Sequence, residues 1–337
     1  MDKIQSVTGG GIQFQIGKEI GSGGFATVYH GVELRKCAPV AIKMAKCPLS
    51  IDSFLNESRA LQSISSKYVP KFIAKGFYGR YPWIAMERLY GSTLEDQLHS
   101  HVMDWRNGVH IGSQVALALQ ESSRHGLIHG DIKPSNIFIG PQGKISLIDW
   151  GLSEYQPYTS PDPSICCTPE YTSPEKIYGD KVDIRSDLYS LGIVLFEVIT
   201  GRTPFEGSSY IEVFEKACST DPDTEGLPFP IRTLIQKCLK TNPDDRYLSP
   251  NQILKAFRFC VSEVNRSNDQ EIDSSGPPRI LPNHSRRPAF SERPSFSFGS
   301  GSVVEKNHLF GIEAEKEEEF VLMDKRSPSE NLEVANR

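Results

Sequence analysis

The sequence predicts an α+β protein in two parts, a small mainly β part with one key helix and then a larger mainly α part. Alternating apolar residues recur through residues 14–86, whereas helical spacing dominates beyond Gly91. The chain has 337 residues, of which 38% are hydrophobic and 23% charged, which is typical of a globular protein with a substantial core. We expect a flexible N-terminus over 1–13 and a polar connector over 87–91.

Bulk properties exclude several classes of protein. A net charge of −5 gives no reason to expect nucleic acid or an anionic membrane as the main partner. The N-terminus lacks an apolar core, and the longest strongly apolar run, Leu188–Ile199, is too short to span a bilayer. Seven cysteines without paired spacing fit reduced thiols, although adjacent Cys166 and Cys167 leave a redox pair as the alternative. We therefore expect a cytoplasmic protein with no membrane span.

The first elements are strands around a glycine-rich stretch. Alternating residues over Ile12–Ile20 predict a strand that enters the stretch Ile20–Val28, and Ala26–Leu34 alternates as the next strand. A dinucleotide-binding loop should open a helix instead, so a glycine hairpin folded over a nucleotide's phosphates fits better. A plain flexible turn is the alternative. Val40–Lys43 then predicts a third strand that ends in a lysine.

One helix and two more strands complete the first part. Ser50–Ile64 has helical spacing, and Glu57 lies in the middle of its apolar face. Because an unpaired buried carboxylate is costly, Glu57 needs a cation, and Lys43 is the obvious candidate. Lys71–Phe77 and Tyr81–Met86 alternate as strands, which makes a five-stranded sheet in all.

Helices dominate the second part. A helix over Trp105–Arg124 should stop at Gly126. The run from Leu188 to Gly201 is apolar on nearly all faces and predicts a helix buried all round. Tyr155–Cys167 lacks periodicity and predicts a surface loop. Further helical patterns lie at Ile211–Ala217, Ile231–Leu239 and Pro250–Val264.

The stretch His129–Gly151 carries the clearest chemistry. Two short apolar runs, Ile137–Ile139 and Ile145–Ile148, predict a ribbon that holds four polar side chains close together: Asp131, Lys133, Asn136 and Asp149. Lysines neutralise phosphate charge, and carboxylate and amide oxygens suit Mg²⁺. This combination predicts phosphoryl-transfer chemistry, which mainly needs positioning and charge neutralisation.

In this order and spacing, the features resemble the eukaryotic-type (Hanks-type) Ser/Thr protein kinases over roughly residues 14–262, and Asp183–Gly207 looks especially like the bacterial members. The resemblance implies the two-lobed protein-kinase-like fold. Its N-lobe would span 14–86, its hinge 87–91 and its C-lobe 92–264. Beyond these, 265–337 is rich in Ser, Pro and acidic residues and predicts a disordered tail.

The resemblance also implies roles for individual residues. Asp131 would accept or orient the proton of the substrate hydroxyl, Lys133 would neutralise the γ-phosphoryl group, and Asn136 with Asp149 would bind Mg²⁺. Lys43 would hold the phosphates of ATP and pair with Glu57. Met86 would be the gatekeeper, with Glu87 and Leu89 as hinge groups. The complete ATP site would comprise Ile20, Gly21, Ser22, Gly23, Gly24, Val28, Ala41, Lys43, Glu57, Met86, Glu87 and Leu89.

Other positions implied by the resemblance are structural. Thr168 would shape the substrate-binding segment, Glu175 would pair with Arg246, and Asp187 would bond to the backbone near His129. Four departures from the family pattern look tolerable: Ala26 for the third loop glycine, Trp150 for Phe, Cys167 for Gly and Ser173 for Ala.

Gly130 is the most informative departure, because most regulated kinases have Arg beside the catalytic Asp. That Arg normally meets a phosphate on the activation loop. Its absence removes one partner that phosphorylated Thr159, Ser160 or Ser164 would need. We therefore predict activity that does not require phosphorylation of this loop.

Two other functions stay open. The central stretch also resembles the aminoglycoside and choline phosphotransferases, but Lys133-Pro134 and Thr168–Glu175 favour a protein acceptor with Ser/Thr hydroxyls. An ATP-binding pseudokinase scaffold is the second alternative. Ser135 lowers the expectation of strict basic-site selectivity. The tail is the best guess for a nearby substrate, at Ser291, Ser295 and Ser297.

Overall fold

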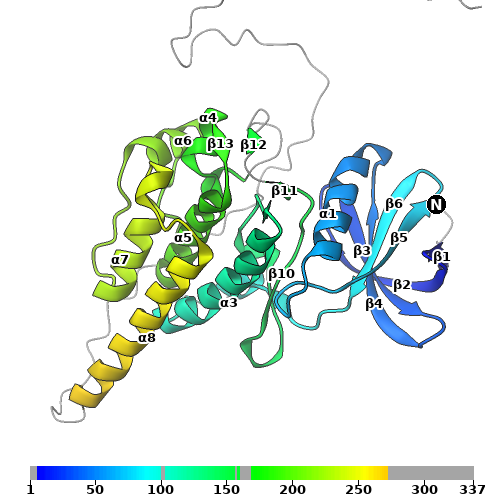
Figure 1. Cartoon of the computed structure of the whole chain (residues 1–337), viewed down its shortest axis with the longest axis horizontal. Helices are drawn as coiled ribbons and strands as arrows, with labels where there is room; N and C mark the ends of the chain where they lie inside the picture. The colour runs from blue at the N-terminus through cyan, green and yellow to red at the C-terminus, as the bar shows by residue number, and fades with distance from the viewer. Residues whose placement is uncertain (1–5, 100–102, 156–157, 160–167, 272–337) are drawn as a thin grey trace, which may run out of the picture. The chain divides into compact units, whose positions relative to one another are not determined.

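A computed structural model of the chain describes residues 6–99, 103–155, 158–159 and 168–271, all within the compact unit Met1–Gly276. A β-sheet lobe is followed by a helical lobe (Figure 1), which confirms the predicted α+β, two-lobed fold. Several sequence-based expectations fall outside the described residues, namely the disordered tail from 272 onward, Cys166 and Cys167, and the loop residues Ser160 and Ser164.

The N-lobe sheet is antiparallel and has six strands in the order β1-β2-β3-β4-β6-β5, rather than the five that the sequence predicted. The additional strand is β1, which pairs with β2 through a tight turn at Gly10 and Gly11. Both glycines have positive φ, +58° and +74°, as the commonest two-residue hairpins require. The strands are β1 (Ser6–Gly9), β2 (Ile12–Ser22), β3 (Ala26–Glu33), β4 (Ala38–Ala45), β5 (Phe72–Tyr78) and β6 (Tyr81–Glu87).

The two faces of this sheet are covered in different ways. One face buries a core that includes Val7, Phe14, Ile42 and Trp83, with the Phe14 and Trp83 rings edge to face at 5.8 Å. Strand β1 also contacts β5, so it helps to close this core. The opposite face is covered by α1 (Ile51–Ser63), which packs on β5 and β6 (Figure 1).

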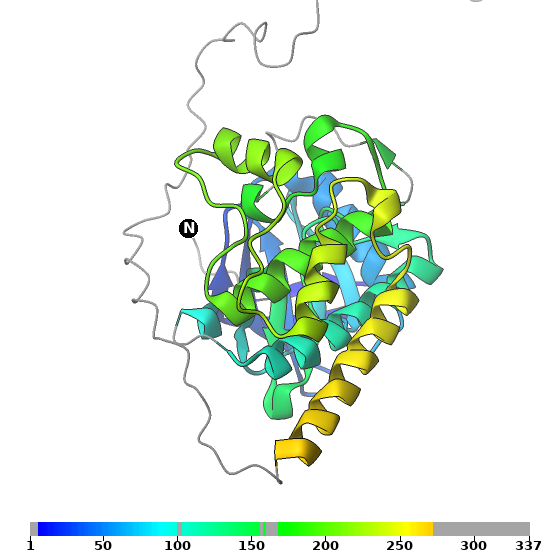
Figure 2. The ribbon, with the colours of Figure 1, turned by 90° about the vertical axis from the view of Figure 1, so that its left-hand side faces the viewer.

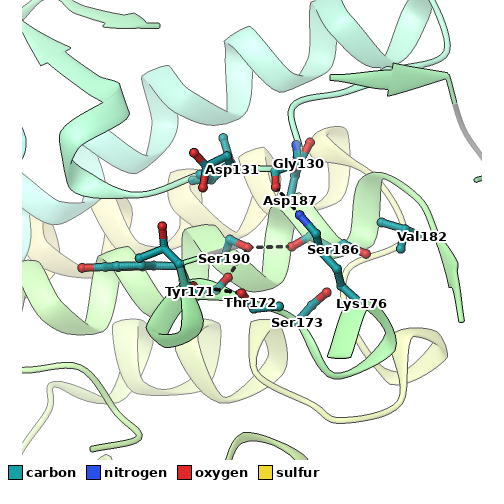
Figure 3. A pocket seen from close by; sticks show the side chains of 12 residues that line it. Gly130, Asp131, Tyr171, Thr172, Ser173, Lys176, Val182, Ser186, Asp187 and Ser190 are labelled. Atoms are coloured by element: carbon teal, nitrogen blue, oxygen red, sulfur yellow. Dashed lines mark hydrogen bonds between the residues drawn. The ribbon is translucent and has the colours of Figure 1, made fainter. Parts of the chain in front are cut away.

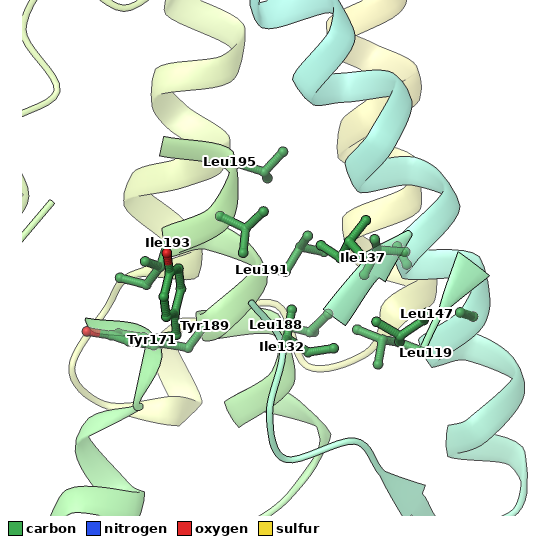
Figure 4. Packing of buried hydrophobic residues seen from close by; sticks show 14 of the residues in the cluster. Leu119, Ile132, Ile137, Leu147, Tyr171, Leu188, Tyr189, Leu191, Ile193 and Leu195 are labelled. Carbon is green, nitrogen blue, oxygen red and sulfur yellow. The ribbon is translucent and has the colours of Figure 1, made fainter. Parts of the chain in front are cut away.

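Helix α5 (Ile184–Thr200) is the centre of the C-lobe, buried on nearly all sides as predicted and ended by Gly201 at φ +75°. Its Leu188 and Leu191 belong to the same core as Ile132 and Ile137 (Figure 4). The other helices are α2 (Leu94–Leu98), α3 (Trp105–Arg124), α4 (Pro174–Tyr178), α6 (Tyr210–Ser219), α7 (Phe229–Cys238) and α8 (Pro250–Glu271).

Helices α3 and α8 pack closely at one glycine. A Cβ on Gly112 of α3 would lie 2.8 Å from Leu195 and 2.6 Å from Phe257, so only glycine allows this approach. Helix α8 packs on α3 and α7 (Figure 2) and continues to Glu271, beyond the helical pattern that the sequence predicted to end at Val264.

Short elements surround the centre of the molecule. The predicted ribbon is the antiparallel pair β9 (Ile137–Ile139) and β10 (Ile145–Leu147), joined on one side by β7 (Ser92–Thr93). Tyr155–Cys167, expected as a surface loop, begins with two short strands because its residues pair with β8 and β13. The remaining elements are β8 (Leu127–Ile128), β11 (Glu154–Tyr155), β12 (Tyr158–Thr159), β13 (Lys181–Val182) and the 3₁₀ turns η1 (Pro48–Ser50), η2 (Pro134–Asn136), η3 (Pro141–Gly143), η4 (Pro169–Tyr171) and η5 (Pro243–Asp245).

The sequence also predicted that the chain lacks a membrane span and that its cysteines are reduced thiols. None of the helices in the described ranges is long and apolar enough to cross a bilayer. The five cysteines described there are free thiols: Cys37, Cys47, Cys218, Cys238 and Cys260.

Candidate active site

The segment between β8 and β9 is held at its first turn by α5. The Asp187 carboxylate accepts hydrogen bonds from the backbone N–H groups of His129 (2.7 Å) and Gly130 (2.9 Å). Asp187 is 2% exposed, and these bonds offset the desolvation of its charge. Gly130 has φ +77°, a left-handed conformation that strains any residue with a Cβ. The predicted contact between Asp187 and the backbone near His129 is thus confirmed.

His129 connects this segment to the residues after β10. Its ring is buried, and burial lowers the pKa of His129, so the imidazole is neutral near pH 7. Nδ1 accepts the backbone N–H of Asp131 at 3.2 Å, which leaves Nε2 to donate to the carbonyl of Ile148 at 3.0 Å. The ring also packs edge on against Trp150, with centroids 4.6 Å apart.

Two of the four central polar side chains, Lys133 and Asn136, contact a third, Asp131. Lys133 Nζ lies 2.8 Å from Asp131 Oδ2 and also donates to Thr168 Oγ1 at 2.9 Å. Asn136 Nδ2 donates to the backbone carbonyl of Asp131 at 2.8 Å and to its Oδ2 at 2.9 Å. Asp131 is therefore fixed by two neighbours, one of which also contacts the segment beginning at Thr168.

Lys43 joins the two lobes. Its ammonium lies 2.7 Å from Glu57 Oε2 on α1 and 2.8 Å from Asp149 Oδ1, which follows β10. Burial opposes the ammonium ion, but the two carboxylates outweigh it and raise the pKa of Lys43 above its usual value. Glu57 is 2% exposed, so the predicted pairing of an inward carboxylate with Lys43 is confirmed.

The turn Asp149–Gly151 packs closely against α1. Asp149 is one of the few non-glycine residues with positive φ, +62°, a strained conformation that commonly occurs at functional sites. Desolvation opposes ionisation of its carboxyl group, but Lys43 lowers the pKa of Asp149 below its usual value. A Cβ on Gly151 would lie 2.5 Å from Ser53 Oγ, so glycine allows α1 to approach this turn. Trp150 is fully buried and donates from Nε1 to the carbonyl of Leu147 at 3.1 Å, which explains why it replaces Phe without loss of the core.

Strand register places several predicted ATP-site residues on one sheet face. Val28 lies opposite Lys43 across β3 and β4, and Ala41 lies opposite Met86 across β4 and β6. Because side chains alternate along each strand, Val28, Ala41, Lys43 and Met86 share the face that carries α1. The structure therefore brings together the residues that the sequence suggested would surround the adenine and phosphates.

The glycine-rich stretch is the predicted hairpin. Ile20, Gly21 and Ser22 end β2, and Gly21 pairs with Val28 on β3. Gly23 N–H donates to the carbonyl of Ala26 at 2.9 Å across the turn that also contains Gly24. The Lys46 ammonium donates to the carbonyl of Gly23 at 2.6 Å.

Some backbone groups of the connector after β6 already form hydrogen bonds within the protein. Glu87 N–H donates to the carbonyl of Lys71 at 2.9 Å, and the carbonyl of Leu89 accepts the Arg88 guanidinium at 2.7 Å. Any contact with an adenine at these residues therefore falls to the Glu87 carbonyl and the Leu89 N–H.

The predicted ion pair between Glu175 and Arg246 is present and buried. Arg246 donates to both carboxylate oxygens of Glu175, at 2.8 and 2.7 Å, and its side chain is 0% exposed. Burial opposes the charged carboxylate, but the bonds from Arg246 lower the pKa of Glu175 below its usual value. The pair anchors α4 and the segment that precedes it.

A small cavity of about 20 Å³ lies between the segment Gly130–Ile132 and α4 (Figure 3). It is far below the roughly 300–1,000 Å³ of small-molecule sites, so it is a packing feature. Lys176 on α4 lines it and donates to the carbonyl of Gly130 at 2.8 Å. Sequence reasoning missed Lys176, since a lone lysine near a helix end is normally solvated.

The comparison with family models agrees with this geometry. The protein kinase domain model matches residues 14–257, most of the chain. The chain therefore belongs to the protein kinase family, in its eukaryotic-type branch with bacterial relatives, as the resemblance predicted.

Three similar proteins are bacterial. The chain is 31% identical over 253 residues to the serine/threonine-protein kinase PknB of Mycobacterium leprae, and 32% identical over 254 residues to that of Mycobacterium tuberculosis. Each match covers 70% of this chain and 41% of the relative. A probable serine/threonine-protein kinase of Streptomyces coelicolor is 31% identical over 271 residues, covering 74% of this chain and 40% of the relative. The chain thus spans about two fifths of the length of these relatives.

Proposed function

We propose that the chain is an ATP- and Mg²⁺-dependent Ser/Thr protein kinase that transfers the γ-phosphoryl group of ATP to protein hydroxyls. The observation that carries the proposal is Lys43, which contacts Glu57 and Asp149 at once. This contact connects α1, the N-lobe sheet and the end of the ribbon. Phosphoryl transfer depends on positioning, so such a connection between the lobes is what the reaction needs.

ATP would lie against the sheet face of Val28, Ala41 and Met86, with Lys43 toward its phosphates. Its adenine would meet the Glu87 carbonyl and the Leu89 N–H. The stretch from Ile20 to Gly24 would cover the phosphates with backbone N–H groups, which glycines leave accessible.

Asn136 and Asp149 fit Mg²⁺ by the chemistry of their oxygens. The Asn136 amide nitrogen is engaged with Asp131, so its carbonyl oxygen is the group left to face a cation. The Asp149 side chain is 48% exposed and its lowered pKa keeps it ionised. Hard oxygens of this kind are typical Mg²⁺ ligands, and the bound ion would neutralise phosphate charge.

Asp131 and Lys133 would act on the acceptor. The substrate hydroxyl oxygen forms a bond to the γ-phosphorus, the bond from that phosphorus to the bridging oxygen breaks, and ADP leaves. The hydroxyl proton passes to the Asp131 carboxylate. Lys133, 2.8 Å from Asp131, keeps that carboxylate oriented and offers positive charge to the transferred group.

The contact between Lys133 and Thr168 favours a protein acceptor over a small molecule. It places the segment Thr168–Glu175 beside the catalytic carboxylate. A chain segment next to the reacting group can contact a peptide substrate, whereas a small-molecule acceptor does not require one. Lys133-Pro134 favours Ser/Thr over Tyr acceptors, and Ser135 disfavours strict selection for basic sites.

Activity should not require phosphate on Thr159, Ser160 or Ser164. Gly130 has no side chain to meet such a phosphate, and its backbone is already held by Asp187. Alanine at all three positions should leave the turnover number within about threefold of the unaltered chain. A hundredfold fall in that number would refute this part of the proposal.

Mass spectrometry before and after incubation with ATP and Mg²⁺ tests the proposal as a whole, with Asp131→Asn as the control. New phosphates should appear on the unaltered chain only. Ser291, Ser295 and Ser297 are the tail acceptors we propose. Retained ATP binding without any transfer to the chain or to a generic protein would instead support a pseudokinase scaffold.

A further inference from the structure

The two peptide units that flank Gly130 are held by opposite charges, one through the Gly130 N–H and the other through the Gly130 carbonyl. The Gly130 N–H donates to the carboxylate of Asp187, and the Gly130 carbonyl accepts from the ammonium of Lys176 at 2.8 Å. Figure 3 shows the Lys176 side chain reaching toward Gly130 and Asp187. Position 130 has no side chain of its own, so these backbone contacts fix the direction in which the chain enters Asp131.

Lys176 reaches this place from a helix that cannot easily move. It follows Glu175 on the five-residue helix α4, and Glu175 is bound to Arg246 in the base of the C-lobe. Two adjacent residues of α4 therefore contact two different parts of the lobe. On a loose helix, forming this bond would also cost backbone entropy, but here the contact between Glu175 and Arg246 has already fixed the helix.

Lys176 also faces the buried Asp187. Burial raises the pKa of Asp187, and the positive charge of Lys176 acts against that rise. Lys176 is only half-buried, so its own desolvation cost is modest. The Lys176 ammonium thus stabilises the Asp187 carboxylate by its charge and the Gly130 carbonyl by a hydrogen bond.

We propose that Lys176 is a positioning residue for Asp131. It joins the segment Thr168–Ser173 and α4 to the segment His129–Asp131, and this connection needs no phosphate. The inference rests on the proposed kinase function and deepens it. The charge at this junction is supplied by the chain itself. Lys176 acts through the Gly130 carbonyl and the Asp187 carboxylate, and it does not touch the reacting groups.

The size of the effect follows from the geometry. Asp131 is adjacent to the clamped peptide unit, so release of the Gly130 carbonyl permits a rotation that displaces the carboxylate. A misplacement of about 1 Å at a reacting group can cost about a hundredfold in rate. ATP contacts lie on the N-lobe face around Lys43 and do not depend on α4. Loss of Lys176 should therefore lower kcat and leave KM for ATP unchanged.

Lys176→Met tests this, because methionine keeps most of the length and volume but neither donates nor carries charge. Transfer to a generic protein acceptor should show kcat lowered about tenfold to a hundredfold, KM for ATP within twofold, and an unchanged melting temperature within a few degrees. Lys176→Arg should restore most of the kcat, since its guanidinium donates to a carbonyl and keeps the charge. The matched control, Lys181→Met at an exposed lysine of β13, should behave like the unaltered chain.

Each outcome decides between the two proposals. An unchanged kcat in Lys176→Met, or a fall that Lys176→Arg does not reverse, would overturn the positioning role while leaving the kinase function intact. No transfer by the unaltered chain would overturn the kinase function and this role together. If Lys176→Met does not fold, Lys176→Leu takes its place, because leucine also neither donates nor carries charge, with the same expected kcat and the same refuting result.

Discussion

Replacement of Arg246 by methionine should unfold the C-lobe more easily than any surface substitution. Arg246 is fully buried and donates to Glu175 twice, and to the carbonyls of Lys240 at 2.6 Å and Thr241 at 2.8 Å. Methionine fills much of the same space but leaves the Glu175 carboxylate without its cation. The two carbonyls lose a donor as well.

The cost can be worked from these contacts. Removing one partner of a buried ion pair typically costs about 3–5 kcal/mol, because the other charge stays buried and uncompensated. That is a large share of the roughly 5–15 kcal/mol that stabilises most domains. At roughly 2–4 °C per kcal/mol for a domain of this size, the melting temperature should fall by roughly 6–20 °C.

The assay is thermal and urea unfolding of Arg246→Met beside Arg258→Met, a control at an exposed arginine of α8 that should stay within about 0.5 kcal/mol. The double variant Glu175→Gln with Arg246→Met should recover part of the loss, since no bare charge remains. A loss below about 1 kcal/mol in Arg246→Met, or no recovery in the double variant, would refute the reasoning.

Four further predictions concern other features of the structure. Stability should fall in acid, because the folded-state pKa of Glu175 lies below its usual value of 4.5. The stabilisation from the Glu175 carboxylate is complete above that pH and is lost as the pH drops through the lowered pKa. Measuring the free energy of unfolding from pH 7 to 3 checks this, and Arg246→Met should show a weaker dependence on pH. Glu57→Gln should lower kcat/KM at least tenfold, because it removes one of the two carboxylates that hold Lys43. The measurement is an ATP-concentration series, and an unchanged kcat/KM would be the contrary result. Gly130→Ala should cost roughly 1–2 kcal/mol by forcing a Cβ into a left-handed residue, and equal stability by urea unfolding would contradict it. Val7→Asp should cost several kcal/mol by burying a carboxylate beneath β1, which the melting temperature measures; an unchanged value would mean that β1 does not cover this core.

Much of the fold could be predicted because its signals are local. The apolar run of α5 and the alternation in β2 to β6 each lie within one segment. The pairing of Glu57 with Lys43 was predictable for a different reason, namely that an inward carboxylate on an amphipathic helix must find a cation. Such arguments need only the element's own sequence and the cost of an unpaired charge.

Other features depend on contacts that no local pattern reveals. Strand β1, with the short sequence Ser6–Gly9, is a strand only because β2 and β5 provide partners. Helix α2 is five residues long and is supported by a capping box between Thr93 and Asp96, a signal that was present but brief. The role of Lys176 requires knowing that Gly130 lies beside α4 across a gap of 46 positions in the sequence.

We propose that this chain transfers phosphoryl groups to protein hydroxyls with Asp131 as the proton acceptor. The most direct test is the initial rate of transfer from γ-labelled ATP to a generic protein, compared between the unaltered chain and Asp131→Asn at equal ATP occupancy. The account predicts measurable transfer that falls about a hundredfold or more in the variant, the usual contribution of a general base. Equal rates in both proteins, or ATP binding with no transfer by the unaltered chain, would contradict it.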